Sequence, residues 1–73
     1  MTTMRRKDLD TATNVNPGLY LVDGDEGDPE GLIVNGPFKD TEAGRVDLAI
    51  LAGQLAKRTG RPASMVLVVD LAG

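Results

Sequence analysis

The 73-residue sequence contains neither cysteine nor histidine. The absence of cysteine removes disulfide bonds and thiolate metal sites. The absence of histidine removes the most common metal ligand and the most common general base near neutral pH. Ser64 is the single serine, and no imidazole is present to activate its hydroxyl as a nucleophile. We therefore expect a protein that is not an enzyme and that carries no cofactor.

Aromatic residues are also scarce, at 3% of the chain. The core must then be built from aliphatic side chains, and a chain of this length buries few of them. Domains below roughly 70–80 residues obtain only about 3–5 kcal/mol from such a core. Because disulfides are absent, association is the remaining source of stability, and we expect an oligomer or a component of a larger assembly.

Long apolar runs and an excess of positive charge are missing too. No stretch approaches the roughly 18 residues that a membrane span requires, and the N-terminus lacks the apolar core of a signal peptide. Asp and Glu outnumber Lys and Arg by 11 to 8, which gives a net charge of -3. This balance disfavours nucleic-acid binding by the domain as a whole. We expect a protein of the cytoplasm or of a virion.

Turn residues divide the first half of the chain into short elements. Residues 1–16 have neither a helical nor a strand period and predict an extended N-terminal arm. A turn signal, Asn-Pro-Gly, precedes a strand-forming run over 19–22. A second run covers 31–35, and the Gly- and Asp-rich segment between the two predicts a β-hairpin. Asn-Gly-Pro over 35–37 is expected to end the second strand, because proline cannot donate to a ladder.

A helix is the best-marked element. Asp40 or Thr41 can cap its start, and Lys57 and Arg58 fall in its last turn, where they oppose the helix dipole. Gly60 follows directly, as is typical of a helix C-terminus. Capping residue, charges and glycine thus agree on both ends of the helix.

The run over 64–70 is almost continuously apolar and β-branched, which predicts a third strand covered on both faces. After a hairpin and a crossover, the third strand often lies at a sheet edge, and no charge guards this one before Asp70. Pairing with another chain would explain such an edge; a central strand would need no partner. Together the elements predict an α+β fold over 17–73, a small β-β-α-β domain with a three-stranded sheet and one helix packed on one face, preceded by the arm over 1–16.

The predicted helix has two apolar stripes. The first is rich in small residues, which suits close packing on a sheet. It contains Ala43, Val46, Ala49, Ile50, Gly53 and Ala56. The second, nearly opposite, includes Leu48, Leu51 and Leu55 and has no obvious partner in so small a chain. Because exposed leucines at this density mark an interaction site, we expect these three to bind a protein; alternatively, the arm or the loop with Phe38 covers them.

The acidic segment Asp23-Gly24-Asp25-Glu26-Gly27-Asp28-Pro29-Glu30 raises the question of a cation site. An EF-hand loop needs glycine at its sixth position and a bidentate Glu at its twelfth. Counted from Asp23, those positions hold Asp28 and Val34. We therefore interpret the segment first as a solvated hairpin loop, with a weaker hard-cation site as the alternative. The acids Asp25, Glu26 and Asp28 are also expected to meet a basic partner surface.

Arg5, Arg6 and Lys7 form a basic cluster in the N-terminal arm. They could contact nucleic acid, an acidic protein surface or the acidic loop of a neighbouring copy, or remain solvated and diluted by nearby acids. No aromatic residue lies close enough in sequence to stack on a base, which disfavours specific nucleic-acid recognition. We therefore assign the cluster to a protein partner or to self-association.

Several short segments mark turns and helix ends. They are Gly36-Pro37-Phe38, Asp40, Glu42-Ala43, Leu55-Ala56 and Thr59-Gly60-Arg61-Pro62-Ala63. Over about half of its length, with these segments as the shared motifs, the chain resembles small β-β-α-β proteins of actinobacteria and their bacteriophages. The resemblance implies a source with a GC-rich genome, in keeping with the plentiful Ala, Gly, Asp, Arg and Val. It carries over no functional residues, because the shared segments shape the fold.

These observations favour a non-enzymatic structural or interaction protein. In its most specific form it is a small accessory protein of a phage particle, of the minor capsid or decoration type, which docks through the leucine stripe and the arm. The alternative is a dimeric phage or bacterial regulator that binds and inhibits a host protein through the acidic loop. A nucleic-acid binder acting through the arm is a third hypothesis, and it predicts steep salt dependence.

Overall fold

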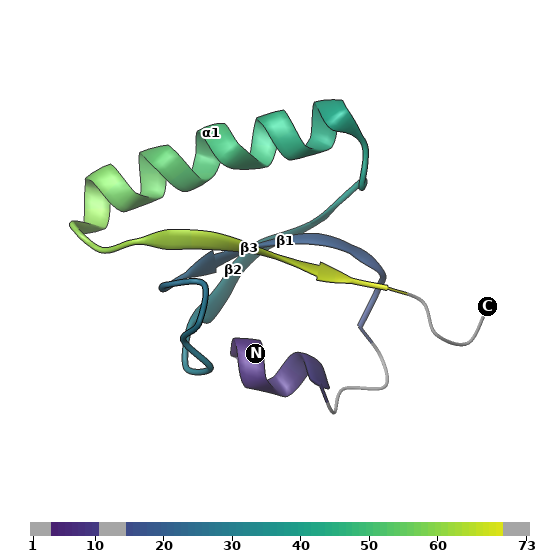
Figure 1. Ribbon diagram of the computed structural model, residues 1–73, viewed down its shortest axis with the longest axis horizontal. Coiled ribbons are helices and arrows are strands. Elements are labelled where there is room, and N and C mark those ends of the chain that lie inside the picture. The colour runs from purple at the N-terminus through teal and green to yellow at the C-terminus, as the bar shows by residue number, and fades with distance from the viewer. Residues whose placement is uncertain (1–3, 11–14, 70–73) are drawn as a thin grey trace.

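The computed structural model describes residues 4–10 and 15–69. The elements in chain order are the 3-10 helix η1 (Arg6–Asp10), β1 (Gly18–Asp23), β2 (Leu32–Phe38), α1 (Glu42–Thr59) and β3 (Ala63–Val68). The strands form one antiparallel sheet in the order β2-β1-β3, with α1 on one face and η1 on the other (Figure 1). The predicted α+β fold of β-β-α-β type is therefore confirmed.

β1 is the strand that is covered on both faces. The buried residues of β1 are Leu19, Tyr20, Leu21 and Val22. β1 is the middle strand, and α1 and η1 lie on the two opposite faces of the sheet (Figure 1). The expectation that the third strand would be the doubly covered one is wrong. β3 lies at the sheet edge, and its burial alternates between half-buried and exposed.

The leucine stripe of α1 faces the sheet. Leu48 is fully buried and forms the core cluster with Leu19 and Leu21. The partly buried residues packed against this cluster are Phe38, Leu51, Ala52, Leu55 and Ala63. The prediction that Leu48, Leu51 and Leu55 would bind a partner is thus wrong for this fold, since these side chains are the larger ones and fill the space above the sheet. The stripe with Val46 and Ile50 points to solvent instead.

The ends of α1 follow the sequence signals. Thr41 is the N-cap, and its side chain accepts a hydrogen bond of 3.0 Å from the backbone N–H of Gly44. Gly60 ends the helix in the left-handed conformation, with φ 71°, and its N–H donates to the carbonyl of Ala56. A threonine oxygen and a glycine without Cβ are what these two positions need. The chain then reverses into β3 (Figure 1).

β2 continues past the point where the sequence predicted its end. It runs through a cis Gly36–Pro37 peptide bond to Phe38, with irregular register against β1. Proline is tolerated there because β2 is an edge strand and Pro37 need not donate to a neighbour. Gly36 has φ 135°, and a Cβ at this position would meet the Tyr20 ring at 2.5 Å. Glycine is therefore required where the central strand's aromatic ring crosses β2.

The N-terminal segment is folded against the sheet. The predicted extended arm over 1–16 is wrong at 6–10, which form η1. Arg5 bridges to Leu32, and the N–H of Ile33 donates to the carbonyl of Met4 at 2.9 Å. The segment thereby covers part of the outer edge of β2. Residues 1–3 and 11–14 of the predicted arm, and 70–73 of the predicted domain, lie outside the described residues.

Candidate interaction site

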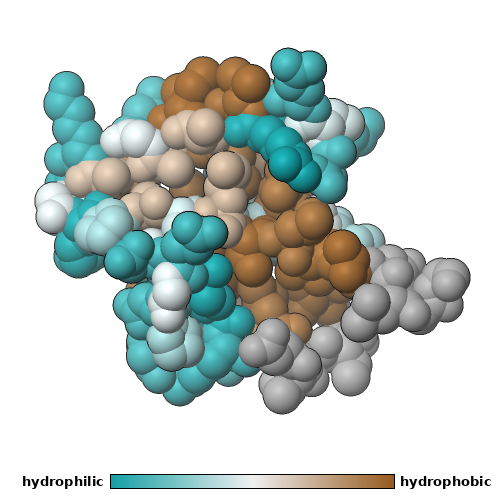
Figure 2. Space-filling model, in the orientation of Figure 1, coloured by the Kyte–Doolittle hydropathy of each residue, from teal (hydrophilic) through white to brown (hydrophobic). Residues whose placement is uncertain are grey.

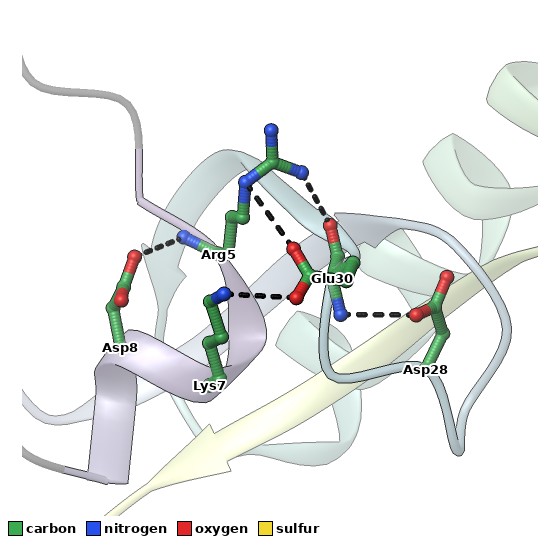
Figure 3. A network of polar contacts seen from close by, with 5 residues as sticks. All are labelled: Arg5, Lys7, Asp8, Asp28 and Glu30. Atoms are coloured by element: carbon green, nitrogen blue, oxygen red, sulfur yellow. Dashed lines mark hydrogen bonds and ion pairs between the residues drawn. The ribbon is translucent and has the colours of Figure 1, made fainter.

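The predicted basic cluster and the acidic loop meet within one chain (Figure 3). Lys7 Nζ lies 2.8 Å from Glu30 Oε1, and Arg5 Nε lies 3.7 Å from Glu30 Oε2. Arg5 also donates to the backbone carbonyl of Glu30 at 2.8 Å. The prediction placed this contact, as one of several options, between neighbouring copies; here it closes η1 onto the loop between β1 and β2.

Arg6 points in another direction from its two basic neighbours. Its guanidinium donates to the hydroxyl of Ser64 at 2.5 Å, and that hydroxyl donates to the carbonyl of Gly24 at 2.8 Å. Arg6 Nε is buried without a hydrogen-bond partner among the described residues. The side chain thus links η1 to the start of β3. Of the three predicted partner-binding cations, Arg6 has a structural role in the chain.

The tip of the acidic loop is a set of tight turns. The N–H of Asp28 donates to the carbonyl of Asp25, and the side chains of Asp25 and Asp28 accept from the N–H groups of Glu26 and Glu30. All four of these residues are exposed. Across residues 4–10 and 15–69, no three acidic side chains are grouped so that they could hold a metal ion. The loop is an exposed, hydrogen-bonded turn that presents the carboxylates of Asp25, Glu26 and Asp28.

The outer face of α1 is weakly apolar. Val46 and Ile50 are 53% and 55% exposed, and Ala43, Ala49 and Gly53 beside them are exposed as well. Figure 2 shows this face as a brown area at the top of the molecule. Two aliphatic side chains among alanine and glycine form a shallow surface, and scattered exposed aliphatics are ordinary for soluble domains.

Within the described residues, the outer edge of β3 is apolar and unpaired. Met65 and Leu67 are 39% and 42% exposed, and Val69 just after the strand is 56% exposed. Met65 and Leu67 pair with Leu21 and Leu19, so they lie on the face that carries α1. In Figure 2 the surface below the helix is brown on this side.

The two sheet edges differ in what covers them. β2 has residues 4–6 beside it, whereas nothing in the described part of the chain pairs with the outer side of β3. From Ala63 to Val69 the sequence has no charged residue. Charged residues, proline and short length are the usual protections of an edge, and β3 lacks the first two. The sequence signalled such an edge through its uncharged apolar run, but it did not identify the exposed side chains.

Among the described residues, Tyr20 and Arg45 have pKa values that their surroundings raise. Burial raises the pKa of Tyr20, whose hydroxyl donates to the carbonyl of Asn16 at 2.6 Å. The hydrogen bond and charge of Asp40 raise the pKa of Arg45, which lies 2.7 Å from that carboxylate on the surface of α1. Both groups make contacts that hold the fold together, Tyr20 with the backbone of Asn16 and Arg45 with Asp40.

Comparison of the chain with family models, curated proteins and solved structures finds no match. Within the described residues, no helix has the length and apolar content needed to cross a bilayer. The candidate site therefore rests on the geometry of this chain, and its best-defined part is the β3 edge with Met65, Leu67 and Val69.

Proposed function

We propose that the chain is a non-enzymatic interaction protein that accepts a strand of its partner on the free edge of β3. The observation that carries the proposal is an uncharged edge strand that exposes the side chains of Met65 and Leu67. An extended partner strand would satisfy the outward N–H and C=O groups of β3 with main-chain hydrogen bonds. The exposed side chains would supply apolar contact and set the register of the added strand.

The small size of the domain supports the same conclusion. Five hydrophobic side chains are buried in the described chain, which are Leu19, Tyr20, Leu21, Val22 and Leu48. A core of this size contributes only about 3–5 kcal/mol to folding. Continuation of the sheet across β3 would bury further apolar area, and each Å² of it would stabilise the fold by about 25 cal/mol. Partner binding would thus stabilise the fold as well as perform the function.

A bacteriophage particle is the assembly in which we place this activity, as a minor capsid or decoration protein. The support is the resemblance of the turn and cap segments to small proteins of actinobacteria and their phages, together with a site suited to joining sheets. The docking element in this proposal is β3, because the leucine stripe is occupied by the sheet.

A strand-addition experiment tests the proposal without a known partner. The probe is a synthetic peptide with the sequence of residues 62–69 and a lysine tail for solubility. Isotope-labelled full chain is titrated with the peptide and followed by amide NMR. We expect shifts along β3 and in the part of α1 beside it; shifts elsewhere only, or none at saturation of the peptide's solubility, would contradict the proposal.

A matched pair of variants controls this titration. Leu67→Lys places a charge on the edge strand, and Val46→Lys places the same charge on the outer face of α1, where exposure is similar. Both are compared with the parent chain by far-UV circular dichroism to establish that they fold. We expect Leu67→Lys to lose the peptide and Val46→Lys to keep it; equal behaviour of the two would count against the edge.

A second candidate function uses the acidic loop. Among the described ion pairs none involves Asp25, Glu26 or Asp28, although neighbouring Glu30 is held by Arg5 and Lys7. Three exposed carboxylates on one ordered turn suit a basic partner surface, as in a regulator that inhibits a host protein.

Titration with an arginine- and lysine-rich peptide, followed by amide NMR, tests this second function. Shifts confined to the loop that vanish on charge reversal at Asp25, Glu26 and Asp28 would support it. Shifts that survive charge reversal would remove it, and Leu67→Lys should leave them unchanged.

A further inference from the structure

We infer that the strand received by β3 is β3 of a second copy of this chain, in an antiparallel pair centred on Val66. The inference rests on the proposed function and names its partner. Three strands from each copy would then form a continuous sheet of six, with both α1 helices on the same face. Such an arrangement has a two-fold axis perpendicular to the sheet, and both copies use the same surface.

The side chains of β3 are compatible with pairing to themselves. The strand has no charge from Ala63 to Val69, so self-pairing places no like charges opposite one another. With the axis at Val66, Met65 of each copy faces Leu67 of the other. All four side chains lie on the helix-covered face and are about 40% exposed in the single chain, at 39% and 42%. The pairing would join them into one apolar cluster.

The position of α1 allows a second contact between the copies. The helix packs mainly against β1 and β3 and much less against β2. If its axis lies over the space between β1 and β3, the axes of the two helices are separated by two strand spacings. With about 4.8 Å per strand, this gives about 10 Å. Packed helices are separated by about 8–10 Å, so the sheet geometry brings the helices to contact distance.

After Leu48, the side of α1 that turns toward the β3 edge consists of small residues. In Figure 1, α1 runs from right to left above the sheet and β3 is nearest the viewer. In a right-handed helix, residues after the sheet-facing Leu48 therefore turn toward the viewer, by about 100° each. Glu42 and Arg45 fall between about 40° and 140° from Leu48 at the start of the helix, and after Leu48 the residues in this range are Ala49, Ala52, Gly53 and Ala56. Their size permits the close helix approach that the strand spacing requires.

Strand and helix place the axis at the same level. α1 ends at Thr59, and β3 begins at Ala63 after the chain reverses. From Ala63 to Val66 the strand rises about 10 Å, which equals about six to seven helix residues at about 1.5 Å each. Counted back from Thr59, this reaches Ala52 and Gly53, the middle of the small-residue side. The middle of β3 and the small-residue side of α1 therefore lie at the same level in the two-fold pairing.

The antiparallel helix pair also determines what Arg45 faces. With the axis between residues 52 and 53, Arg45 faces the C-terminal end of α1 in the second copy, close to its Gly60. The C-terminus of a helix carries a partial negative charge and attracts cations. Arg45 is exposed and is already paired with Asp40 at 2.7 Å, and Lys57 and Arg58 lie in the last turn that it would face, so the helix pair does not depend on this contact.

The oligomeric state and its geometry test the inference together. The molar mass of the full chain is measured by light scattering over a wide concentration range, for the parent, Leu67→Lys and Val46→Lys. We expect a dimer that Leu67→Lys converts to a folded monomer and that Val46→Lys leaves intact. A parent chain that stays monomeric at all concentrations, or a dimer that resists Leu67→Lys, would overturn it.

Spin labels identify the arrangement even if Leu67→Lys fails to fold. The chain has no cysteine, so Ile50→Cys and Val34→Cys each introduce one exposed labelling site. The pairing predicts a backbone separation of about 12 Å at Ile50, from two strand spacings and five helix residues between the copies. At Val34, on the opposite sheet edge, it predicts about 26 Å, from five strand spacings and an offset of about three strand residues between the copies. The reverse order of the two distances would overturn the inference.

The test separates the inference from the proposed function. A monomeric chain that still binds the peptide of residues 62–69 along β3 would retain the strand-accepting edge and remove the second copy as its partner in solution. A monomeric chain that binds no peptide would remove both. A dimer with the long distance at Ile50 would locate the self-contact elsewhere and contradict the inference alone.

Discussion

Replacement of Leu48 by alanine should nearly unfold the protein. Leu48 has no exposed surface and stands at the centre of the core, against Leu19 and Leu21. Removal of a fully buried leucine side chain costs about 2–5 kcal/mol, since apolar burial is lost and a cavity remains. The whole core of a domain this small supplies only about 3–5 kcal/mol. Leu48→Ala therefore removes most of the free energy of unfolding.

Ile50→Ala is the matched control on the same helix. Ile50 is 55% exposed on the opposite face, and alanine has the higher helix propensity. We expect a change within about 0.5 kcal/mol, the usual range for surface substitutions. The two variants delete side chains of similar size within one helical turn, so their difference reports which face of α1 packs on the sheet.

Urea unfolding followed by far-UV circular dichroism measures both variants at low protein concentration. Because Leu48→Ala can fall below the limit of a measurable transition, Leu48→Met and Ile50→Met provide a milder pair, with an expected loss of up to about 1.5 kcal/mol at Leu48. Equal losses at the two positions, or a larger loss at Ile50, would refute the orientation of the helix.

Three further substitutions test separate contacts. Thr41→Ala should lower the free energy of unfolding by about 1 kcal/mol through loss of the N-cap bond to Gly44, measured by urea unfolding. Glu30→Gln should cost less than about 1 kcal/mol, because its pairs with Arg5 and Lys7 are exposed, and should weaken the dependence of stability on salt. Burial raises the pKa of Tyr20, so the stability that its neutral hydroxyl contributes is present below the unfolded value of about 10 and is lost as pH rises above it. Tyr20→Phe should flatten that alkaline decline in pH-dependent unfolding and cost about 1 kcal/mol at neutral pH.

The order of elements was predictable from local chemistry. Thr41 and Gly60 mark the helix ends because capping depends on the residues at the ends themselves. The hairpin was predictable because glycine and aspartate clusters separate two strand-forming runs. Each of these signals acts within a few residues of the structure that it predicts.

The orientation of α1 could not be read from the sequence because both of its sides are apolar. Helical period identifies a buried face only when the other face is polar. Here size decided: Leu48 and Leu55 fill the space above the sheet, while the small residues opposite them remain at the surface. The assignment of the leucines to a partner followed from choosing the wrong stripe.

Long-range contacts account for the remaining differences. η1 forms where Arg5 and Lys7 reach Glu30, more than twenty residues later in the chain, and no periodic signal records such a contact. The strand through Pro37 is possible because β2 lies at an edge, which depends on the order of all three strands. For the interaction site, the uncharged run over 63–69 indicated an open edge, but the exposed positions Met65 and Leu67 emerge only from the pairing with β1.

Hydrogen exchange of the backbone amides of β3, measured by NMR at low and high protein concentration, tests the strand-pairing edge most directly. Amides that point away from β1 should exchange rapidly in dilute solution and become protected as the concentration rises, while the amides of β2 keep their exchange rates. Outward amides of β3 that exchange at one rate across the whole concentration range, or new protection confined to β2 or to the outer face of α1, would contradict the account.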